Sequence, residues 1–156
     1  MPTTKASIPL VLLRLVMGWY LLVDGYLAVT TPNWSAQGFL LSAKTFPALY
    51  AWFAEPAQLW WVNPVNAWGV LLIGVALLLG VFVRPAAWAG AILMLLYYFP
   101  QYHLPKVPHG YIVEEHIIWC VVFIAIATIP AAQSFGLSRS LRKTFLGRLP
   151  VIWRFI

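Results

Sequence analysis

The sequence predicts an all-α integral membrane protein, folded as an antiparallel four-helix bundle with an interfacial helical external loop and a basic amphipathic C-terminal tail. Two observations lead to this prediction. Of the 156 residues, 62% are hydrophobic and 9% are charged, whereas soluble domains carry about a quarter charged residues. In addition, four apolar segments approach the length of roughly 17–25 residues that a bilayer-crossing helix needs. A chain so poor in charge cannot cover a water-facing surface, so its helices are expected to face lipid.

The four segments expected to cross the bilayer are residues 8–30, 66–83, 85–101 and 111–131. A signal peptide is the competing interpretation of the first segment. Its apolar run is too long, Arg14 and Asp24 interrupt it, and no A-x-A cleavage site follows, so we expect a retained span. Residues 1–133 then form one four-span membrane domain, and residues 134–156 form the tail.

Residues 31–65 are expected to form a long external loop with two short helices lying along the membrane surface. Its apolar residues recur at helical spacing, and Pro47 would interrupt a single continuous helix. This segment is either a cap over the bundle or a lid over a lipid-soluble substrate. Aromatic residues at a membrane interface favour the cap; the tryptophans expected to flank the helices are Trp34, Trp52, Trp60 and Trp61.

The tail has the pattern of a basic amphipathic helix. Leu137, Leu141, Phe145 and Leu149 share one helical face, and arginines and a lysine lie away from it. Such a helix is attracted to anionic lipid of the inner leaflet. Docking against a partner subunit is the alternative use.

The distribution of lysine and arginine predicts the orientation. With four spans, both termini and the short turn at Arg84 lie on one side, and the other side carries only Lys44 and Lys106. The positive-inside rule therefore places both termini in the cytoplasm of a prokaryotic cell, with the chain multi-pass in the plasma (inner) membrane. Arg14 lies near the cytoplasmic end of its helix, where it is expected to extend to the headgroups.

This topology places the acid–base groups on the outer half of the molecule. The outer half then holds all four carboxylates and all three histidines, namely Asp24, Glu55, Glu114, Glu115, His103, His109 and His116.

Small residues are expected to bring the spans together, since burial from lipid supplies little driving force. Gly69, Ile73, Ala76 and Gly80 form one stripe on the second span, with Gly74 nearby. The segment around residues 100–111 contains three prolines, so we expect an ordered, non-helical connection.

Composition excludes several function classes. The single cysteine, Cys120, excludes an internal disulfide or a CxxC pair, and no CxxCH motif is present for covalent haem. The net charge of +6 comes from residues at predicted membrane edges, so we expect no nucleic-acid partner. No GxSxG or phosphate-binding glycine loop supports hydrolysis.

The stretch VEEHIIW, which opens the fourth span, allows two main interpretations. Glu114, Glu115 and His116 can cap the helix, because its dipole favours negative charge at the N-terminus. Alternatively, Glu115 and His116 belong to a proton-coupled quinone site. Glu115, His116 and Asp24 would then exchange protons, and the walls of the quinone slot would come from Trp119, Tyr97 and Tyr98.

Asp24 is the deepest carboxylate. An ionised carboxylate near the bilayer centre costs about 2.5–3.5 kcal/mol, so Asp24 is expected to face the bundle, be protonated or pair with His116. A metal or haem site from His103, His109 and His116 is a third interpretation, but these residues lack a recognisable ligand spacing. We predict no metal.

Four stretches, in this order, carry a family resemblance: LRLVMGWYLL, PNWSAQGFL, NAWGVLLIGVALLLGVFVRPAAWAGAILMLLYYF and VEEHIIW. Over about residues 12–137 the sequence resembles the DoxX/DoxD-like membrane proteins, which include the membrane subunit of thiosulfate:quinone oxidoreductase. The resemblance implies a four-helix membrane protein that works with partner proteins in sulfur or redox metabolism. The matching candidate residues are Glu115, His116, Trp34, Gly38 and Arg84.

The chain also departs from the family pattern. Many relatives have a lysine near the end of the first helix, where this chain has Ala28, and Asp24 occupies a position that is more often apolar. A lost cation and a gained carboxylate disfavour an anionic substrate such as thiosulfate.

The expected function is therefore a membrane subunit of a quinone-linked redox assembly, respiratory or sulfur-oxidising, with a quinone and proton site near the outer leaflet. Its expected partners are the lipid bilayer, membrane quinone and other subunits. If the chain is catalytic, it is a subunit of a quinone-dependent oxidoreductase. The alternative is a non-catalytic accessory or scaffold subunit of a larger membrane complex.

Overall fold

A computed structural model describes residues 4–108, 110–133 and 136–137 of the chain. The predicted amphipathic tail helix lies almost entirely outside these described residues. In chain order the elements are α1 (Thr4–Thr30), α2 (Gln37–Leu41), α3 (Pro47–Phe53), α4 (Pro56–Leu79), α5 (Val83–Gln101), β1 (Lys106–Val107), β2 (Gly110–Tyr111), α6 (Glu115–Thr128) and a 3₁₀ turn, η1 (Pro130–Gln133).

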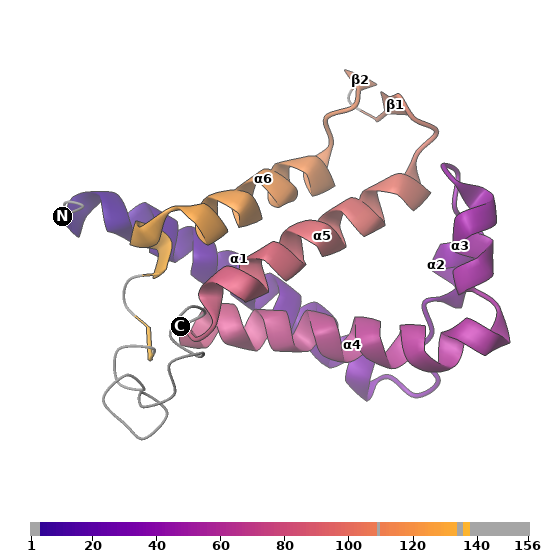
Figure 1. Cartoon of the computed structure of the whole chain (residues 1–156), viewed down its shortest axis with the longest axis horizontal. Helices are drawn as coiled ribbons and strands as arrows, with labels where there is room; N and C mark the ends of the chain where they lie inside the picture. Colours follow the sequence, from indigo (N-terminus) through magenta and orange to yellow (C-terminus); the bar gives the residue numbers. More distant parts are fainter. Residues whose placement is uncertain (1–3, 109, 134–135, 138–156) are drawn as a thin grey trace.

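The long helices pack in pairs (Figure 1). Some pairs are neighbours in the sequence, and one joins helices that are far apart in it. α1 lies along α4, α5 lies along α6, and α4 contacts α5 less extensively near the turn that joins them. The short helices α2 and α3 pack against each other and lie beside the other ends of α4 and α5. The all-helical class is confirmed. The contacts between α1 and α6 are few, so the four helices are more open than the predicted bundle.

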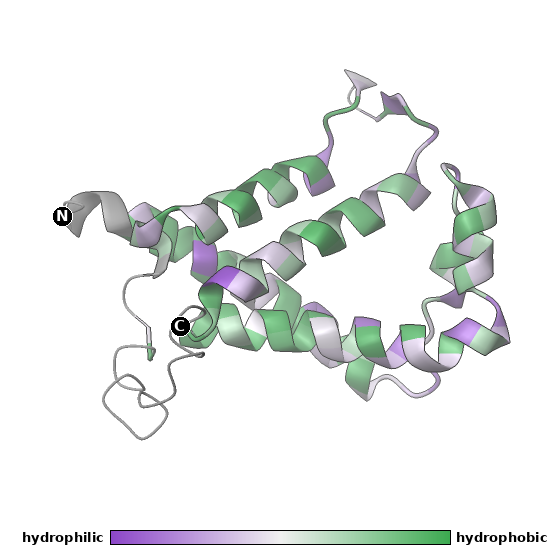
Figure 2. Ribbon diagram, viewed as in Figure 1, coloured by the Kyte–Doolittle hydropathy of each residue, from purple (hydrophilic) through white to green (hydrophobic). Residues whose placement is uncertain are grey.

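Two helices in the described part of the chain are long and apolar enough to cross a membrane: residues Ile8–Thr30 of α1 and Pro56–Leu79, which is α4. α6 is a shorter apolar helix. Figure 2 shows hydrophobic residues along all of the long helices and hydrophilic residues mainly near helix ends and connections. Crossing of the bilayer by α5 and α6 stays a prediction.

The second predicted span, residues 66–83, was placed too late in the sequence. α4 begins at Pro56, which occupies the first helical turn, where a missing N–H costs nothing. It ends before Gly80, whose positive φ of 67° stops the helix. Pro64 lies inside α4 without ending it, so Trp60 and Trp61 belong to this helix and not to the loop. The two short helices predicted for the loop are present, and Pro47 begins the second.

The fourth predicted span, residues 111–131, begins later than expected. Residues 110–111 pair with 106–107 as an antiparallel hairpin, and Glu114 has an extended backbone before α6 begins at Glu115. The non-helical connection predicted around residues 100–111 is confirmed from residue 102 onward.

The contact between α1 and α4 depends on glycines that allow the two backbones to approach. A Cβ atom on Gly25 would lie 2.3 Å from the Leu71 nitrogen, and one on Gly74 would lie 2.4 Å from the Leu22 nitrogen. The predicted stripe on the second span is therefore wrong in detail, because Gly74 makes the contact. A Cβ atom on Gly69 would meet nothing within 4 Å.

Two arginines hold the end of the molecule opposite the hairpin. Arg14 is only 1% exposed, and its Nη1 donates to the Ala132 carbonyl at 2.9 Å. Arg84 donates through Nε to the Ala127 carbonyl at 3.3 Å. The prediction that Arg14 extends to the headgroups is wrong. Its guanidinium instead binds the chain segment that follows α6.

Candidate functional site

The polar cluster at the start of α6 is built on Glu114 and His116. Glu114 precedes the helix with φ −146° and ψ 173°, and its Oε2 accepts a hydrogen bond from the His116 backbone N–H at 3.0 Å. This bond is a helix N-cap. The same carboxylate lies 2.9 Å from His116 Nδ1. Both side chains are buried, with exposures of 4% for Glu114 and 5% for His116.

The end of α5 completes the cluster. The Tyr102 hydroxyl donates to Glu114 Oε1 at 3.1 Å, and the Gln101 amide nitrogen lies 3.2 Å from His116 Nε2. A carboxylate only accepts hydrogen bonds, so Nδ1 carries a proton. In the neutral ring Nε2 then accepts from the Gln101 amide. A hydrogen-bond network therefore joins the end of α5 to the start of α6, and both ring nitrogens of His116 have a partner in it.

Aromatic rings surround the imidazole of His116. Trp119, one turn later on α6, lies 5.4 Å from it between ring centroids, and Tyr97 of α5 meets it edge-on at 6.5 Å. Tyr20 of α1 lies 4.8 Å from the Trp119 ring. Residues from three helices therefore meet beside the buried imidazole of His116.

The remaining predicted site residues lie at the edge of this cluster. Glu115 is exposed, and it interacts electrostatically with the Tyr20 hydroxyl. Asp24 is also exposed, and its carboxylate interacts with the hydroxyls of Tyr20 and Tyr97. The pairing of Asp24 with His116 that the sequence suggested is not observed among the described residues. The carboxylate partner of His116 is Glu114.

Tyr98, the third predicted wall residue, has a different role. It is 4% exposed, and its hydroxyl donates to the Ile112 carbonyl at 2.6 Å. Ile112 has a positive φ of 64°, an uncommon conformation for a β-branched residue. Tyr98 therefore holds the hairpin segment against α5.

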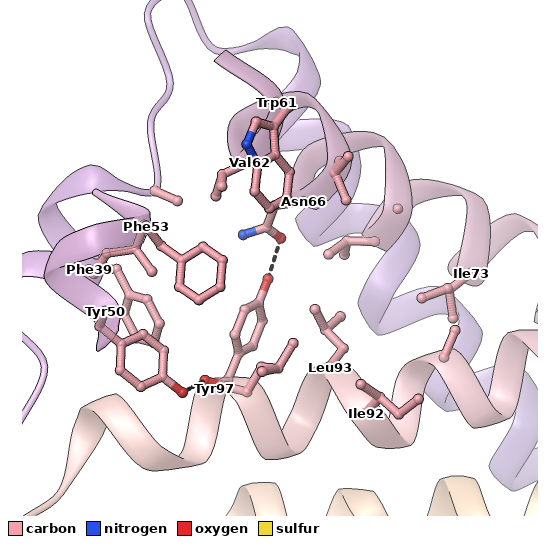
Figure 3. Close-up of a pocket in the computed structure, with 17 residues that line it drawn as sticks. Phe39, Tyr50, Phe53, Trp61, Val62, Asn66, Ile73, Ile92, Leu93 and Tyr97 are labelled. Carbon is pink, nitrogen blue, oxygen red and sulfur yellow. Dashed lines mark hydrogen bonds between the residues drawn. The ribbon is translucent and has the colours of Figure 1, made fainter. Parts of the chain in front are cut away.

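A cavity of about 500 Å³ lies on the other side of Tyr97, between α4, α5 and the short helices α2 and α3 (Figure 3). Its volume falls in the range of about 300–1,000 Å³ that is typical of small-molecule sites. Its walls are almost wholly apolar. The labelled residues that line it are Phe39, Tyr50, Phe53, Trp61, Val62, Asn66, Ile73, Ile92, Leu93 and Tyr97.

The polar feature of this cavity is a hydrogen bond between helices. The Tyr97 hydroxyl donates to Asn66 Oδ1 at 2.5 Å, which joins α5 to α4 across the cavity. Tyr97 is thus the wall between the cavity and the His116 cluster. Among the predicted wall residues, Tyr97 lines this cavity, and Trp119 and Tyr98 are not among its lining residues.

The helices α2 and α3 are fixed over the cavity by hydrogen bonds to both long helices. The Tyr50 hydroxyl donates to the Leu96 carbonyl of α5 at 3.0 Å, and the Ala36 N–H donates to Asn63 Oδ1 of α4 at 3.0 Å. Burial raises the pKa of the Tyr50 phenol above its usual value of 10.0. The position of α2 and α3 fits both interpretations of residues 31–65, a cap over the bundle and a lid over a lipid-soluble substrate.

Within the part of the chain that the structure describes, one group of three side chains at the start of α6 could bind a metal. Glu114, Glu115 and His116 each offer a ligand atom within 4.8 Å of the others. His116 Nδ1 and Glu114 are already bound to each other, so a metal would have to displace this pair. His103 is exposed in the hairpin connection, and His109 lies outside the described residues. The absence of a metal stays a prediction.

Comparison with known proteins adds one finding: the DoxX family model matches residues 10–102. The chain belongs to the DoxX family. The match runs from α1 to the end of α5, so it includes Asp24, Asn66 and Tyr97 and ends before VEEHIIW. No curated protein and no solved structure matches the chain. Family membership and the apolar helices together indicate a membrane protein in contact with the lipid bilayer.

Sequence reasoning missed three residues of the site. Glu114 was treated as a cap only, although its position two residues before His116 allows one carboxylate to bind both the ring and the backbone N–H. Asn66 and Gln101 were not singled out. An asparagine in the apolar run NAWGVLLIG was the available signal for a polar contact within the membrane domain.

Proposed function

We propose that this DoxX protein is the membrane subunit of a quinone-linked redox assembly, respiratory or sulfur-oxidising, and that quinone binds in the cavity between α4 and α5. The supporting observation is the cavity itself: about 500 Å³, apolar and aromatic, with the Asn66–Tyr97 pair as its polar feature. A quinone ring needs an apolar slot and a few polar groups to orient its oxygens.

The His116 cluster would supply protons to this site. Quinone becomes quinol by taking up two electrons and two protons. A partner subunit that oxidises a reduced donor, such as an inorganic sulfur compound, would supply the electrons. His116 and Glu115 would exchange the protons, and Asp24 would act through Tyr97, with which it interacts electrostatically. The Tyr97 ring contacts the His116 ring edge-on and also lines the cavity.

In this proposal the cavity lies in the outer half of a prokaryotic plasma (inner) membrane. Four helices cross the bilayer and both termini are cytoplasmic. The arrangement follows from the excess of lysine and arginine at the termini and the Arg84 turn. The protons would then be exchanged with the external side.

Substitution of the proton-exchanging residues tests the proposal. In the assembly purified from its native membrane, His116→Gln and Glu115→Gln should each lower quinone reduction by at least tenfold, with unchanged amounts of folded, assembled protein. The matched control is Glu55→Gln, since Glu55 is an external carboxylate before α4 and does not line the cavity. Unchanged turnover in both variants would contradict the proposal.

A scaffold subunit is the second candidate, and the observation that favours it is the N-cap of α6. Glu114 caps the helix and binds His116 and Tyr102, so the cluster is fully accounted for as a structural lock. Mass spectrometry of the gently extracted assembly separates the two functions. Stoichiometric quinone that is lost in His116→Gln supports the redox subunit, whereas a defined partner complex without quinone supports the scaffold.

A further inference from the structure

The cavity between α4 and α5 is enclosed more completely on one side than on the other. On α2 and α3 its lining includes Leu40 and Tyr50, which are 8% and 5% exposed. On α4 and α5, by contrast, Val65, Ile92 and Leu96 line the cavity and are 62%, 58% and 51% exposed. A side chain that lines a cavity and is also more than half exposed borders its opening. The cavity is therefore covered by α2 and α3 and opens between α4 and α5.

Gly69 leaves space beside α4 at this opening. Val65, Gly69 and Ile73 follow one another at intervals of four residues, so they share a helical face, and all three line the cavity. A Cβ atom on Gly69 would meet nothing within 4 Å. Figure 3 shows the side chains of Ile73 on α4 and of Ile92 and Leu93 on α5 around the same space.

The surroundings of the opening are apolar. α4 is long and apolar enough to cross a membrane, and the exposed apolar edge of a spanning helix faces lipid. Among the described residues that line the cavity, none carries a charge. A charged molecule would lose its hydration at such an edge without gaining a partner, whereas a molecule dissolved in the bilayer meets only surroundings like those it leaves.

The cover formed by α2 and α3 is held at several points. In the connection between the two helices, the Lys44 N–H donates to the Pro100 carbonyl at 2.9 Å. Next to it, the Thr45 hydroxyl donates to the Tyr102 carbonyl at 2.6 Å. These bonds add to the two that join the cover to α4 and to the middle of α5. Displacement of the cover would break all of them, whereas the opening between α4 and α5 needs no rearrangement.

We propose that the cavity takes up its ligand sideways from the bilayer, between α4 and α5, and that α2 and α3 are a fixed cap over it. The ligand is a lipid-soluble ring compound whose apolar chain extends back into the lipid past Val65, Ile92 and Leu96. This inference rests on the proposed function and specifies its substrate class, a long-chain quinone. A chain longer than the cavity has room only through the opening.

Photoaffinity labelling of the full chain in phosphatidylcholine nanodiscs tests the path of the ligand. One decylubiquinone probe carries an azide on its ring, and a second carries a diazirine in the middle of its decyl chain. Only labelling that excess unmodified decylubiquinone removes is counted. The ring probe should label residues that line the cavity, and the chain probe should label residues 65–72 and 89–96. Labelling of residues 37–53 by the chain probe, or no such labelling by either probe, would overturn the proposal.

Tryptophan substitutions at the opening test the route of entry. Val65→Trp/Ile92→Trp enlarges two exposed side chains, so the protein core is unchanged. Exchange of bound ring probe for unmodified quinone, followed by photolysis at intervals after mixing, should become about tenfold slower. Leu72→Trp/Leu95→Trp is the matched control, since both leucines are exposed on the same helices and neither lines the cavity. Equal exchange rates in the two double variants would contradict sideways entry.

Substitutions that loosen the cover test whether it is a cap or a lid. Thr45→Val and Asn63→Leu each remove an anchor of the cover, at different points, and neither residue lines the cavity. Hydrogen exchange in residues 37–53 should become about fivefold faster in each variant. The exchange of bound quinone should keep its wild-type rate. Quinone exchange that accelerates together with hydrogen exchange would show that α2 and α3 are a lid.

The outcomes distinguish this proposal from the proposed function. If labelling and exchange follow the opening between α4 and α5 but His116→Gln and Glu115→Gln leave turnover unchanged, sideways entry stands and the redox role fails. If those variants lose turnover but the chain probe labels α2 and α3, the redox role stands and sideways entry fails.

Discussion

The two sides of α4 make opposite kinds of contact. Toward α1 the backbones approach so closely that Gly74 leaves no room for a side chain, whereas toward α5 the helices separate around a cavity of about 500 Å³. Gly69 and Gly74 lie on the same helix, five residues apart, and one borders the open space while the other fills the tight contact. A small residue in a membrane helix therefore marks either a contact or a cavity.

The largest effect is expected when the tight contact is forced open. A Cβ atom on Gly74 would lie 2.4 Å from the backbone nitrogen of Leu22, so Gly74→Leu requires α1 and α4 to separate. We expect a loss of at least about 3 kcal/mol in the free energy of unfolding. Gly69→Leu is the matched control and should be neutral or stabilise α4 by about 0.5–1 kcal/mol, because leucine has the higher helix propensity. Thermal unfolding in detergent micelles measures both, and equal melting temperatures would contradict the comparison.

An effect of intermediate size is expected at the contact between α5 and α6, because a polar network holds the end of this contact that lies next to the hairpin. Glu114→Ala removes the N-cap of α6 and the buried partner of His116 together. We expect a loss of about 2–3 kcal/mol in stability, with faster hydrogen exchange in the first turn of α6. Glu115→Ala, the exposed neighbour, should cost less than about 1 kcal/mol. Equal losses in the two variants would show that burial of Glu114 is unimportant.

A smaller effect is expected at the cover of the cavity. Tyr50→Phe removes the hydrogen bond from α3 to the Leu96 carbonyl and leaves the ring in place. The free energy of local opening of α2 and α3 should fall by about 1 kcal/mol, seen as about fivefold faster hydrogen exchange in residues 37–53. Tyr26→Phe is the control, since Tyr26 is 58% exposed. Unchanged exchange in Tyr50→Phe would mean that packing alone holds the cover.

The smallest effect concerns high pH. Burial, and then the hydrogen bond to Glu114, raise the pKa of Tyr102 above 10.0. The folded chain therefore keeps this proton more tightly than the unfolded chain, so stability is complete below about pH 10 and declines as pH rises further. Melting temperatures between pH 8 and 11, with tyrosinate absorbance, should show a weaker decline in Tyr102→Phe than in the wild type. Identical profiles would contradict this contribution of Tyr102.

The helical class and the existence of the short helices α2 and α3 could be predicted from the sequence, because apolar run length and Pro47 act locally. The start of α4 could not: the span was expected to begin at residue 66, whereas the helix begins at Pro56 and continues through Pro64. Glycine spacing indicated close packing but did not indicate which glycine makes the contact. That choice depends on the rotation of α4, which its neighbours set together.

The candidate site was only partly predictable for a related reason. His116 and Tyr97 stand out as polar or aromatic groups in apolar runs, and the structure places their rings together. Pairing with Asp24, on a different helix, is one of the alternatives that the sequence leaves open for His116, but Glu114 is its partner because the extended backbone before α6 brings this carboxylate to the ring. No sequence pattern indicates the cavity, because it forms only when α4, α5 and the short helices α2 and α3 pack together.

The bond from Arg14 to Ala132 also constrains the order in which the protein can be made. Its two residues are 118 positions apart, so a ribosome delivers the donor near the start of synthesis and the acceptor near the end. The buried guanidinium of Arg14 can therefore gain this partner only after the whole of α6 has been made.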